Sequence, residues 1–197
     1  MDFLERHVAK LVYDWKDDSG ISHRQELEQY SLRALDDAIE CLFRDESTPS
    51  GKHSHQFRIA HEVLGLARKR LLESRGDIAS CKTFVLLYGA VKDAIARIPG
   101  VGPLMVYDAA LRLGASMNVS PDEVYLQQGT LDGARELFRT VGMSKTLKNG
   151  SSLPKSDFEP WLTELDAAEI ENFLCVMCNR MDPKQPYGKR HSSKARC

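Results

Sequence analysis

The chain has 197 residues, of which 42% are hydrophobic and 28% charged, and its formal net charge is −1. This composition is typical of an ordinary globular protein, and no apolar run approaches the ~20 residues that a membrane-spanning helix needs. Residues 1–5 lack the apolar core of a secretory signal, and the five cysteines are scattered, so we expect reduced thiols, no membrane association and a cytoplasmic location.

Apolar residues recur at helical spacing along most of the chain, and no convincing strand is evident. The eight or so expected helices cover residues 3–15, 22–43, 55–74, 81–95, 103–117, a short segment from 120, 130–141 and 166–177. Ser22 with Gln25 and Asp166 with Glu169 are expected capping boxes, and Gly76–Asp77 is an expected break. Residues 142–157 are an expected linker.

These elements predict an all-α protein with one domain over residues 1–182, although the length also allows two small helical lobes. The tail, residues 183–197, holds five basic residues and no acidic one, and we expect it to be disordered. Without these five, acidic residues outnumber basic ones in the rest of the chain. An acidic body argues against strong non-specific DNA binding but leaves room for a local contact with phosphates.

The stretch ARIPGVGPLMVYDAALRLG, residues 96–114, reverses the chain between two helices. Pro99 ends the first helix, Gly100 and Gly102 tolerate positive φ, and Pro103 suits the first turn of the second helix. We expect Val101 to pack between the two helices. The unpaired N–H groups at the start of the second helix, beside glycines without side chains, are suited to a phosphate oxygen.

This pattern resembles the helix-hairpin-helix motif of DNA repair and recombination proteins, including base-excision glycosylases; the motif lies within residues 80–117 and matches at 96–113. The resemblance implies a sequence-independent contact with the DNA backbone through Pro99, Gly100, Val101, Gly102 and Leu104. In some members hairpin carbonyls hold a monovalent cation; the matching carbonyls are those of Ala96, Ile98 and Val101.

The sequence departs from the motif after Gly102, and this leaves a second interpretation open. Leu104 stands where the family commonly has lysine or another polar residue, and Met105-Val106 replaces Thr-Ala. The apolar run 104–107 also fits a buried helix, in which case the glycines form a tight corner in a protein-interaction module whose partner the sequence does not identify.

A third interpretation is a monofunctional DNA glycosylase. Asp122 lies about as far beyond the hairpin as the catalytic aspartate of those enzymes, where it would stabilise positive charge on the sugar or activate a water. Leu104 occupies the position of the lysine nucleophile of bifunctional members, which excludes lyase chemistry. Alternatively, Ser120 and Asp122 only begin a helix.

A second candidate phosphate contact lies at residues 130–135. Thr130 is expected to cap a helix, and the first amides of that helix together with Arg135 would face a phosphate. Gly133 inside the same helix instead indicates close packing of two helices.

Cys175, Cys178, His191 and Cys197 are spaced almost like zinc ligands, although the first two also continue an apolar helix face. No hydrolase or nucleotide-binding motif is present, so we expect no cofactor and favour a non-enzymatic role.

Overall fold

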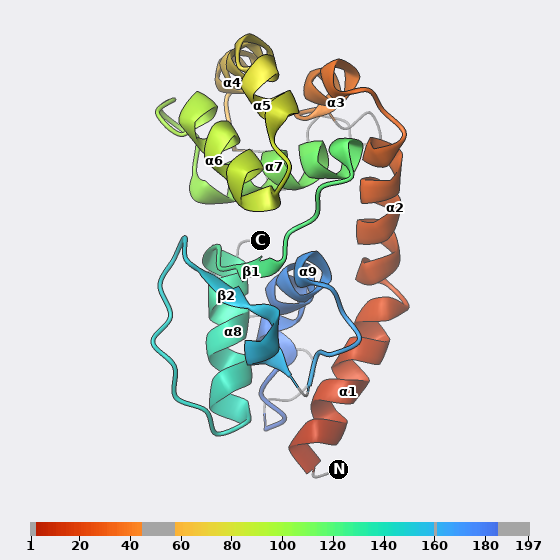
Figure 1. Ribbon diagram of the computed structural model, residues 1–197. Helices are drawn as coiled ribbons and strands as arrows, with labels where there is room; N and C mark the ends of the chain where they lie inside the picture. The colour runs from red at the N-terminus through yellow and green to blue at the C-terminus, as the bar shows by residue number, and fades with distance from the viewer. Residues whose placement is uncertain (1–2, 45–57, 160, 185–197) are drawn as a thin grey trace. The chain divides into compact units, whose positions relative to one another are not determined.

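The computed structural model describes residues 3–44, 58–159 and 161–184, and most of them are helical (Figure 1). The α-helices are α1 (Phe3–Lys16), α2 (Ser19–Ser31), α3 (Leu35–Cys41), α4 (His61–Glu73), α5 (Arg75–Ser80), α6 (Phe84–Ile95), α7 (Pro103–Met117), α8 (Gln128–Thr140) and α9 (Ala167–Met177). They are joined by strands β1 (Glu123–Tyr125) and β2 (Ser152–Pro154) and by the 3₁₀ helices η2 (Lys155–Phe158) and η3 (Cys178–Arg180). The all-α class is confirmed. Among the described helices, none has the length and apolar character needed to cross a membrane.

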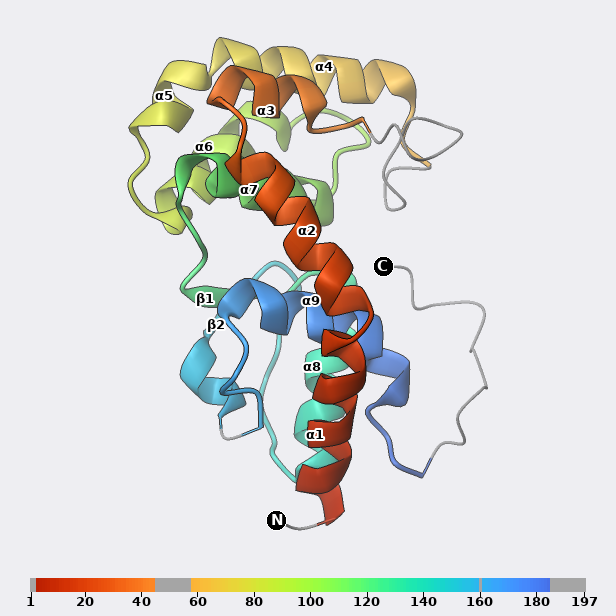
Figure 2. The same cartoon turned by 90° about the vertical axis from the view of Figure 1, so that its right-hand side faces the viewer.

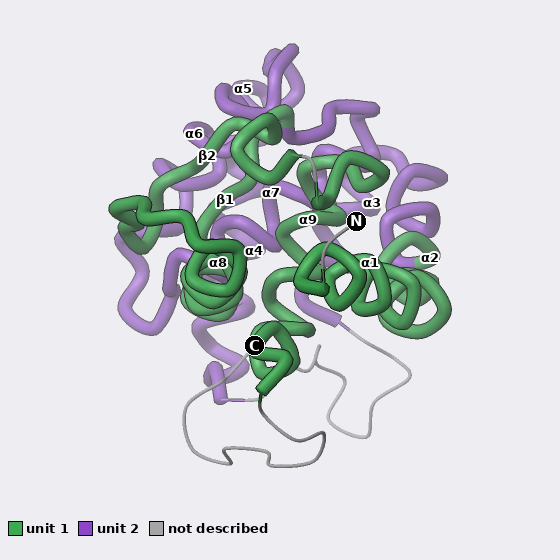
Figure 3. Tube along the Cα trace, turned by 90° about the horizontal axis from the view of Figure 1, so that it is seen from below, with its two compact units in different colours: residues 1–25, 122–197 green, residues 26–121 purple. Residues whose placement is uncertain are grey.

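The chain divides into two compact units (Figure 3). Unit 1 combines residues 1–25 with residues 122–197, and unit 2 is residues 26–121. The boundary falls inside α2, and the single domain expected over residues 1–182 therefore contains two centres of packing.

Unit 1 is built around α1, α8 and α9 (Figures 1 and 2). Trp15 of α1 is fully buried, meets the ring of Phe173 edge-on at 6.2 Å between centroids, and donates its indole N–H to Asn172 at 3.0 Å. Phe138 stacks on Phe158 at 5.4 Å. These aromatic contacts place residues from both ends of the chain in one core.

Two helix ends in unit 1 test the capping predictions. Asp166 caps α9 by accepting the Glu169 N–H at 2.8 Å, and the Glu169 side chain accepts the Asp166 N–H at 3.1 Å, which confirms the predicted box. Thr130 does not cap α8, because α8 begins earlier, at Gln128, with Gln127 as its N-cap and no side-chain bond there.

The short segment expected to be helical from residue 120 is instead extended. β1 pairs antiparallel with β2, with Val124 opposite Leu153 and Tyr125 opposite Ser152. Val124 and Tyr125 are a β-branched and an aromatic residue, and both are buried, as is typical of a strand. The expected linker 142–157 is therefore wrong in part, because it contains β2 and most of η2.

Unit 2 consists of α3–α7 and the second half of α2, with α3 and α4 side by side (Figure 2). The single helix expected over 22–43 is two helices, because α2 ends at Ser31 and Ala34 takes an extended backbone before α3. The expected capping box at Ser22 is also wrong, since Ser22 lies inside α2. Gly76 and Asp77 do not break the chain but lie in α5. The bounds predicted for α7 are confirmed at both ends.

One buried ion pair lies in unit 2. The Arg112 side chain of α7 is only 6% exposed, and its Nε donates to Glu26 Oε1 at 2.8 Å. Burial by itself lowers the pKa of Arg112, but the negative charges of Glu26 and Asp108 and the hydrogen bond to Glu26 outweigh it and raise that pKa. Burial raises the pKa of Tyr30 to about 12, so the phenol stays neutral beside the pair at physiological pH.

Candidate functional site

The turn between α6 and α7, residues 96–102, reverses the chain in unit 2 (Figure 2). Its backbone is held by two hydrogen bonds of 3.0 Å, from the Ile98 N–H to the Ile95 carbonyl and from the Val101 N–H to the Ile98 carbonyl. Gly102 is the N-cap of α7, and Pro103 occupies the first helical turn, where a missing N–H costs nothing. The predicted order along the chain, one helix, a tight turn and a second helix, is confirmed.

The two glycines of the turn differ in what they require. Gly100 has φ +95°, which disfavours any side chain, and its surroundings include the Val63 methyl groups of α4. Gly102 has φ −100° and ψ 170°, an ordinary extended backbone, so of the two glycines Gly100 alone uses the tolerance of positive φ. A Cβ at Gly102 would meet nothing within 4 Å. The space in front of Gly102 is therefore open to a ligand.

The apolar residues of the turn are arranged differently from the prediction. Ile98 is buried, whereas Val101, which was expected to pack between the helices, is only half-buried. Leu104 is also half-buried, while the next three residues of α7 are buried. The first helical residue, Pro103, is exposed. Only the start of α7 thus faces outward, and the rest of the apolar run belongs to the core.

The start of α7 has the groups that an anion requires. The first N–H groups of an α-helix have no partner within the helix, and Gly102 has no side chain with which to cap them. Pro99 and Gly100 beside them are exposed. The positive end of the helix dipole adds attraction for a negative charge.

Two basic side chains that were not predicted as site residues accompany the turn. Lys92 in the last turn of α6 and Arg97 in the turn itself are exposed. Among the residues that the structure describes, neither enters an ion pair, whereas Arg68, Arg70, Arg75 and Arg112 of the same unit all do. The signal in the sequence is their spacing of five residues immediately before the Pro99–Gly102 reversal.

The predicted cation site uses the carbonyls of Ala96, Ile98 and Val101. The Ile98 carbonyl already accepts the Val101 N–H. A carbonyl oxygen has two lone pairs, so this bond leaves one for a cation. The monovalent-cation site stays a prediction. The described part of the chain contains no group of three or more His, Cys, Asp or Glu residues that is suited to a metal ion.

No family model, curated protein or solved structure matches this chain. The evidence for a role of the turn is therefore the geometry of residues 96–102 and their resemblance to the helix-hairpin-helix motif.

The second predicted phosphate contact is not formed as expected. Thr130 is fully buried in α8, and its hydroxyl is hydrogen-bonded to the carboxylate of Glu171 on α9. Arg135 is exposed but pairs with Asp132, three residues earlier, at 3.4 Å. Thr130 cannot meet a phosphate without unpacking α8 from α9, so this part of the predicted site is wrong.

The glycosylase candidate Asp122 lies in the bend that precedes β1 and is exposed. It does not begin a helix, so the interpretation of Ser120 and Asp122 as a helix start is wrong. Base-excision chemistry needs its catalytic group inside a pocket that receives the extruded base, and an exposed side chain in a bend does not meet this requirement. The structure thus adds nothing in favour of glycosylase chemistry.

The predicted zinc ligands are only partly described. Cys178 in η3 is a buried free thiol, and burial, more than any other cause, raises its pKa, which disfavours the thiolate that zinc needs. Cys175 on α9 is half-buried, and its role as a zinc ligand stays a prediction. His191 and Cys197 lie outside the described residues.

A hollow of about 580 Å³ lies between α5 and α6 of unit 2. Its rim includes Val85 and Leu86 of α6, which are 54% and 59% exposed, and its lining includes Gly89 and Asp93 of the same helix. Burial raises the pKa of Cys81, which also lines the hollow. Contiguous exposed apolar surface is a feature of protein-binding sites, and Val85 and Leu86 supply two apolar side chains beside this hollow.

Proposed function

We propose that the α6–α7 turn binds the phosphate backbone of nucleic acid without reading its sequence. The observation that carries the proposal is the uncapped start of α7, which opens onto empty space at Gly102. Its helix dipole and unpaired N–H groups favour an anionic oxygen, and the absence of a side chain allows that oxygen to approach closely.

The charges around the turn support the same interpretation. Lys92 and Arg97 bring two positive charges to the end of α6 without acidic partners in the described part of the chain. Contacts of this kind neutralise phosphates and carry no information about bases. With so few cations and an acidic body, binding is expected to be weak and strongly dependent on salt.

Gly102→Asp separates binding from folding. An aspartate N-cap accepts the first amides of α7 and complements its dipole, so it should stabilise the protein by about 0.5–1 kcal/mol. The same carboxylate occupies the position proposed for a phosphate and repels it. We expect Kd for short duplex DNA to rise about tenfold or more, measured by fluorescence anisotropy at low ionic strength on two unrelated sequences.

Two further variants serve as controls. Gly76→Asp adds the same charge at an exposed glycine of α5 that also has nothing within 4 Å, and it should leave DNA binding nearly unchanged. Gly102→Ser caps the amides without adding charge, so it should weaken binding less than the aspartate does. Absence of DNA binding by the unmodified chain at low salt, or equal loss with Gly76→Asp, would overturn the proposal.

The second candidate function is protein binding through the α5–α6 hollow, which the exposure of Val85 and Leu86 favours. If copies of the chain associate through this face, Val85→Ser with Leu86→Ser should convert the associated form to monomer in size-exclusion chromatography with light scattering. Leu32→Ser, which removes another highly exposed leucine of unit 2, is the matched control. A chain that is monomeric at all concentrations has no such self-association.

A further inference from the structure

The hollow between α5 and α6, which lie side by side in unit 2 (Figure 1), is lined by two carboxylates. Asp77 belongs to α5 and Asp93 to α6, and both are exposed. Within the described part of the chain, neither carboxylate enters an ion pair or a side-chain hydrogen bond, whereas other acidic residues of unit 2 pair with arginines. Both carboxylates are therefore available to a partner from outside the chain.

The charge of this hollow is not balanced from within. Among the described residues that line it there is no lysine, arginine or histidine. Lys82 and Lys92 are exposed and close in sequence, but they do not line the hollow. The lining thus has a net charge of −2 when Asp77 and Asp93 are ionised, and this charge favours a positively charged occupant.

The α6 wall of the hollow has the form of a helix-binding groove. Its residues recur at intervals of three or four, so they lie on one face of the helix, about 14 Å long at 1.5 Å per residue. Large apolar side chains stand at one end of this face, and a Cβ at Gly89 in its middle would meet nothing within 4 Å. An amphipathic helix laid along such a face places its apolar side chains in the groove. The α6 residues are Val85, Leu86, Gly89, Ala90, Asp93 and Ala94.

We propose that the α5–α6 hollow binds a basic amphipathic helix of a partner protein, with apolar side chains of the partner on Val85 and Leu86 and its lysine or arginine side chains at Asp77 and Asp93. This inference rests on the second candidate function, protein binding at the same hollow, and it specifies the chemistry of the partner. A second copy of this chain fits less well, because an isologous contact would bring the carboxylates of the two copies together.

Two synthetic peptides test the preference for positive charge. One is an amphipathic helix of leucine, alanine and lysine, about 15 residues long, and in the other glutamine replaces every lysine, which preserves the helix propensity. Fluorescence anisotropy of the labelled peptides should give a Kd about two- to thirtyfold lower for the lysine peptide, as two exposed ion pairs allow. Added salt should reduce this difference.

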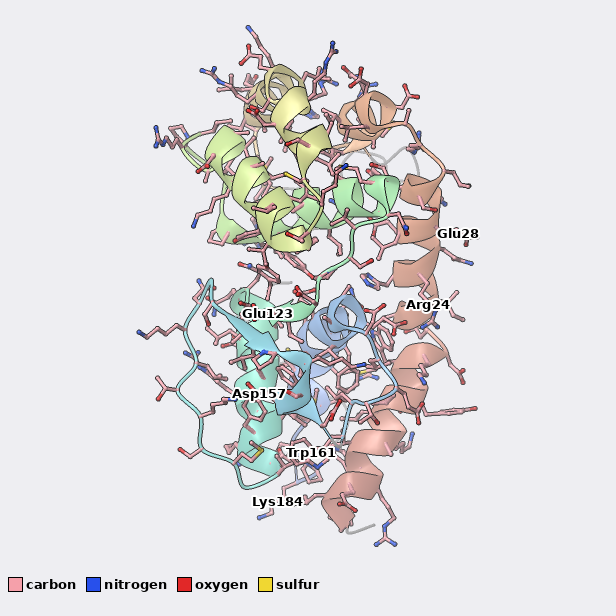
Figure 4. The ribbon with its side chains drawn as sticks, viewed as in Figure 1. Arg24, Glu28, Glu123, Asp157, Trp161 and Lys184 are labelled. Carbon is pink, nitrogen blue, oxygen red and sulfur yellow. The ribbon has the colours of Figure 1, made fainter. Side chains whose placement is uncertain are left out.

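A charge-removing double variant tests where the lysine peptide binds. Asp77→Asn with Asp93→Asn should raise the Kd of the lysine peptide to that of the glutamine peptide and leave the latter nearly unchanged. The matched control is Glu28→Gln with Asp37→Asn. These are two exposed acidic residues of unit 2 that do not line the hollow (Glu28 is labelled in Figure 4), so their removal should have little effect.

A side chain added at Gly89 tests whether the peptides occupy the groove. Gly89→Gln fills the α6 face and should weaken binding of both peptides. Gly65→Gln in α4 is the control and should leave both unchanged. Each variant should fold, because a Cβ meets nothing within 4 Å at either position and glutamine favours a helix more than glycine does.

The outcomes separate this inference from the function on which it rests. Equal Kd values for the two peptides, or normal binding of the lysine peptide by Asp77→Asn with Asp93→Asn, would overturn the basic partner but leave protein binding at the hollow in place. Peptide binding that Gly89→Gln does not weaken would place the peptide elsewhere and also overturn the inference. If neither peptide binds but Val85→Ser with Leu86→Ser dissociates an associated form, the occupant is a second copy and the inference is wrong. If neither peptide binds and the chain is monomeric, the second candidate function fails as well.

Discussion

Replacing Gly133 with alanine is expected to lower the free energy of unfolding of unit 1 by about 2–3 kcal/mol. A Cβ at this position of α8 would lie 2.0 Å from the Leu174 carbonyl oxygen of α9 and 2.6 Å from its carbonyl carbon. Both atoms belong to the backbone, so no change of side-chain rotamer relieves the clash, and the two helices must move apart. The gain of about 1 kcal/mol in helix propensity on replacing glycine is too small to compensate.

Gly65→Ala is the matched control for this change. Gly65 also lies inside a helix, α4, but a Cβ there would meet nothing within 4 Å. Only the propensity term applies, so this variant should be more stable by about 0.5–1 kcal/mol. Urea unfolding followed by circular dichroism, with an unchanged slope, measures both effects. If Gly133→Ala is as stable as the unmodified chain, α8 and α9 do not cross as closely as the structure shows.

Gly133 also shows which part of a helix contact can be predicted from the sequence alone. A glycine inside a helix predicts a close approach of another element, because its propensity cost needs a reason, and this interpretation is confirmed. The sequence does not identify α9 as the partner. That contact joins residues far apart in the chain, and no local pattern encodes it.

Elements with local signals were predicted well. α7 begins at a proline and ends where its apolar periodicity stops, and the box at Asp166 and Glu169 fixes the start of α9. The pairing of β1 with β2, in contrast, depends on a partner more than twenty residues away, and each strand has only three residues. α8 begins without a side-chain cap, so Thr130 was the nearest apparent signal and the wrong one.

The candidate sites divide in the same way. The reversal at Gly100 follows from residues that are adjacent in the sequence, and its positive φ is confirmed. Which glycine of the turn faces open space depends on how α4 packs against the turn, so the difference between Gly100 and Gly102 was not predictable. The hollow lined by α1 and residues 161–164 combines segments near opposite ends of the chain, and therefore no sequence motif indicates it.

Glu26→Gln is expected to destabilise unit 2 by about 2–3 kcal/mol, because it leaves the Arg112 guanidinium charge buried without its main partner. The loss should be below the 3–5 kcal/mol typical of fully buried pairs, since the Glu26 side chain is 35% exposed and water screens part of the interaction. Asp108 supplies a second negative charge near Arg112, which also reduces the loss.

Arg112→Met removes the buried charge together with its cost, so it should destabilise the protein less than Glu26→Gln does. Arg112 Nη1 is buried and has no hydrogen-bond partner, so the native guanidinium is itself incompletely satisfied. In the Arg112→Met background, Glu26→Gln should change stability by less than about 0.5 kcal/mol, which gives a coupling energy of about 1.5 kcal/mol or more. Additive effects of the two substitutions in urea unfolding would instead show that Glu26 stabilises α2 independently of Arg112. The asymmetry between the two single variants follows from desolvation: removing the more exposed partner leaves the more deeply buried charge uncompensated, whereas removing the buried partner leaves a carboxylate that water can still reach.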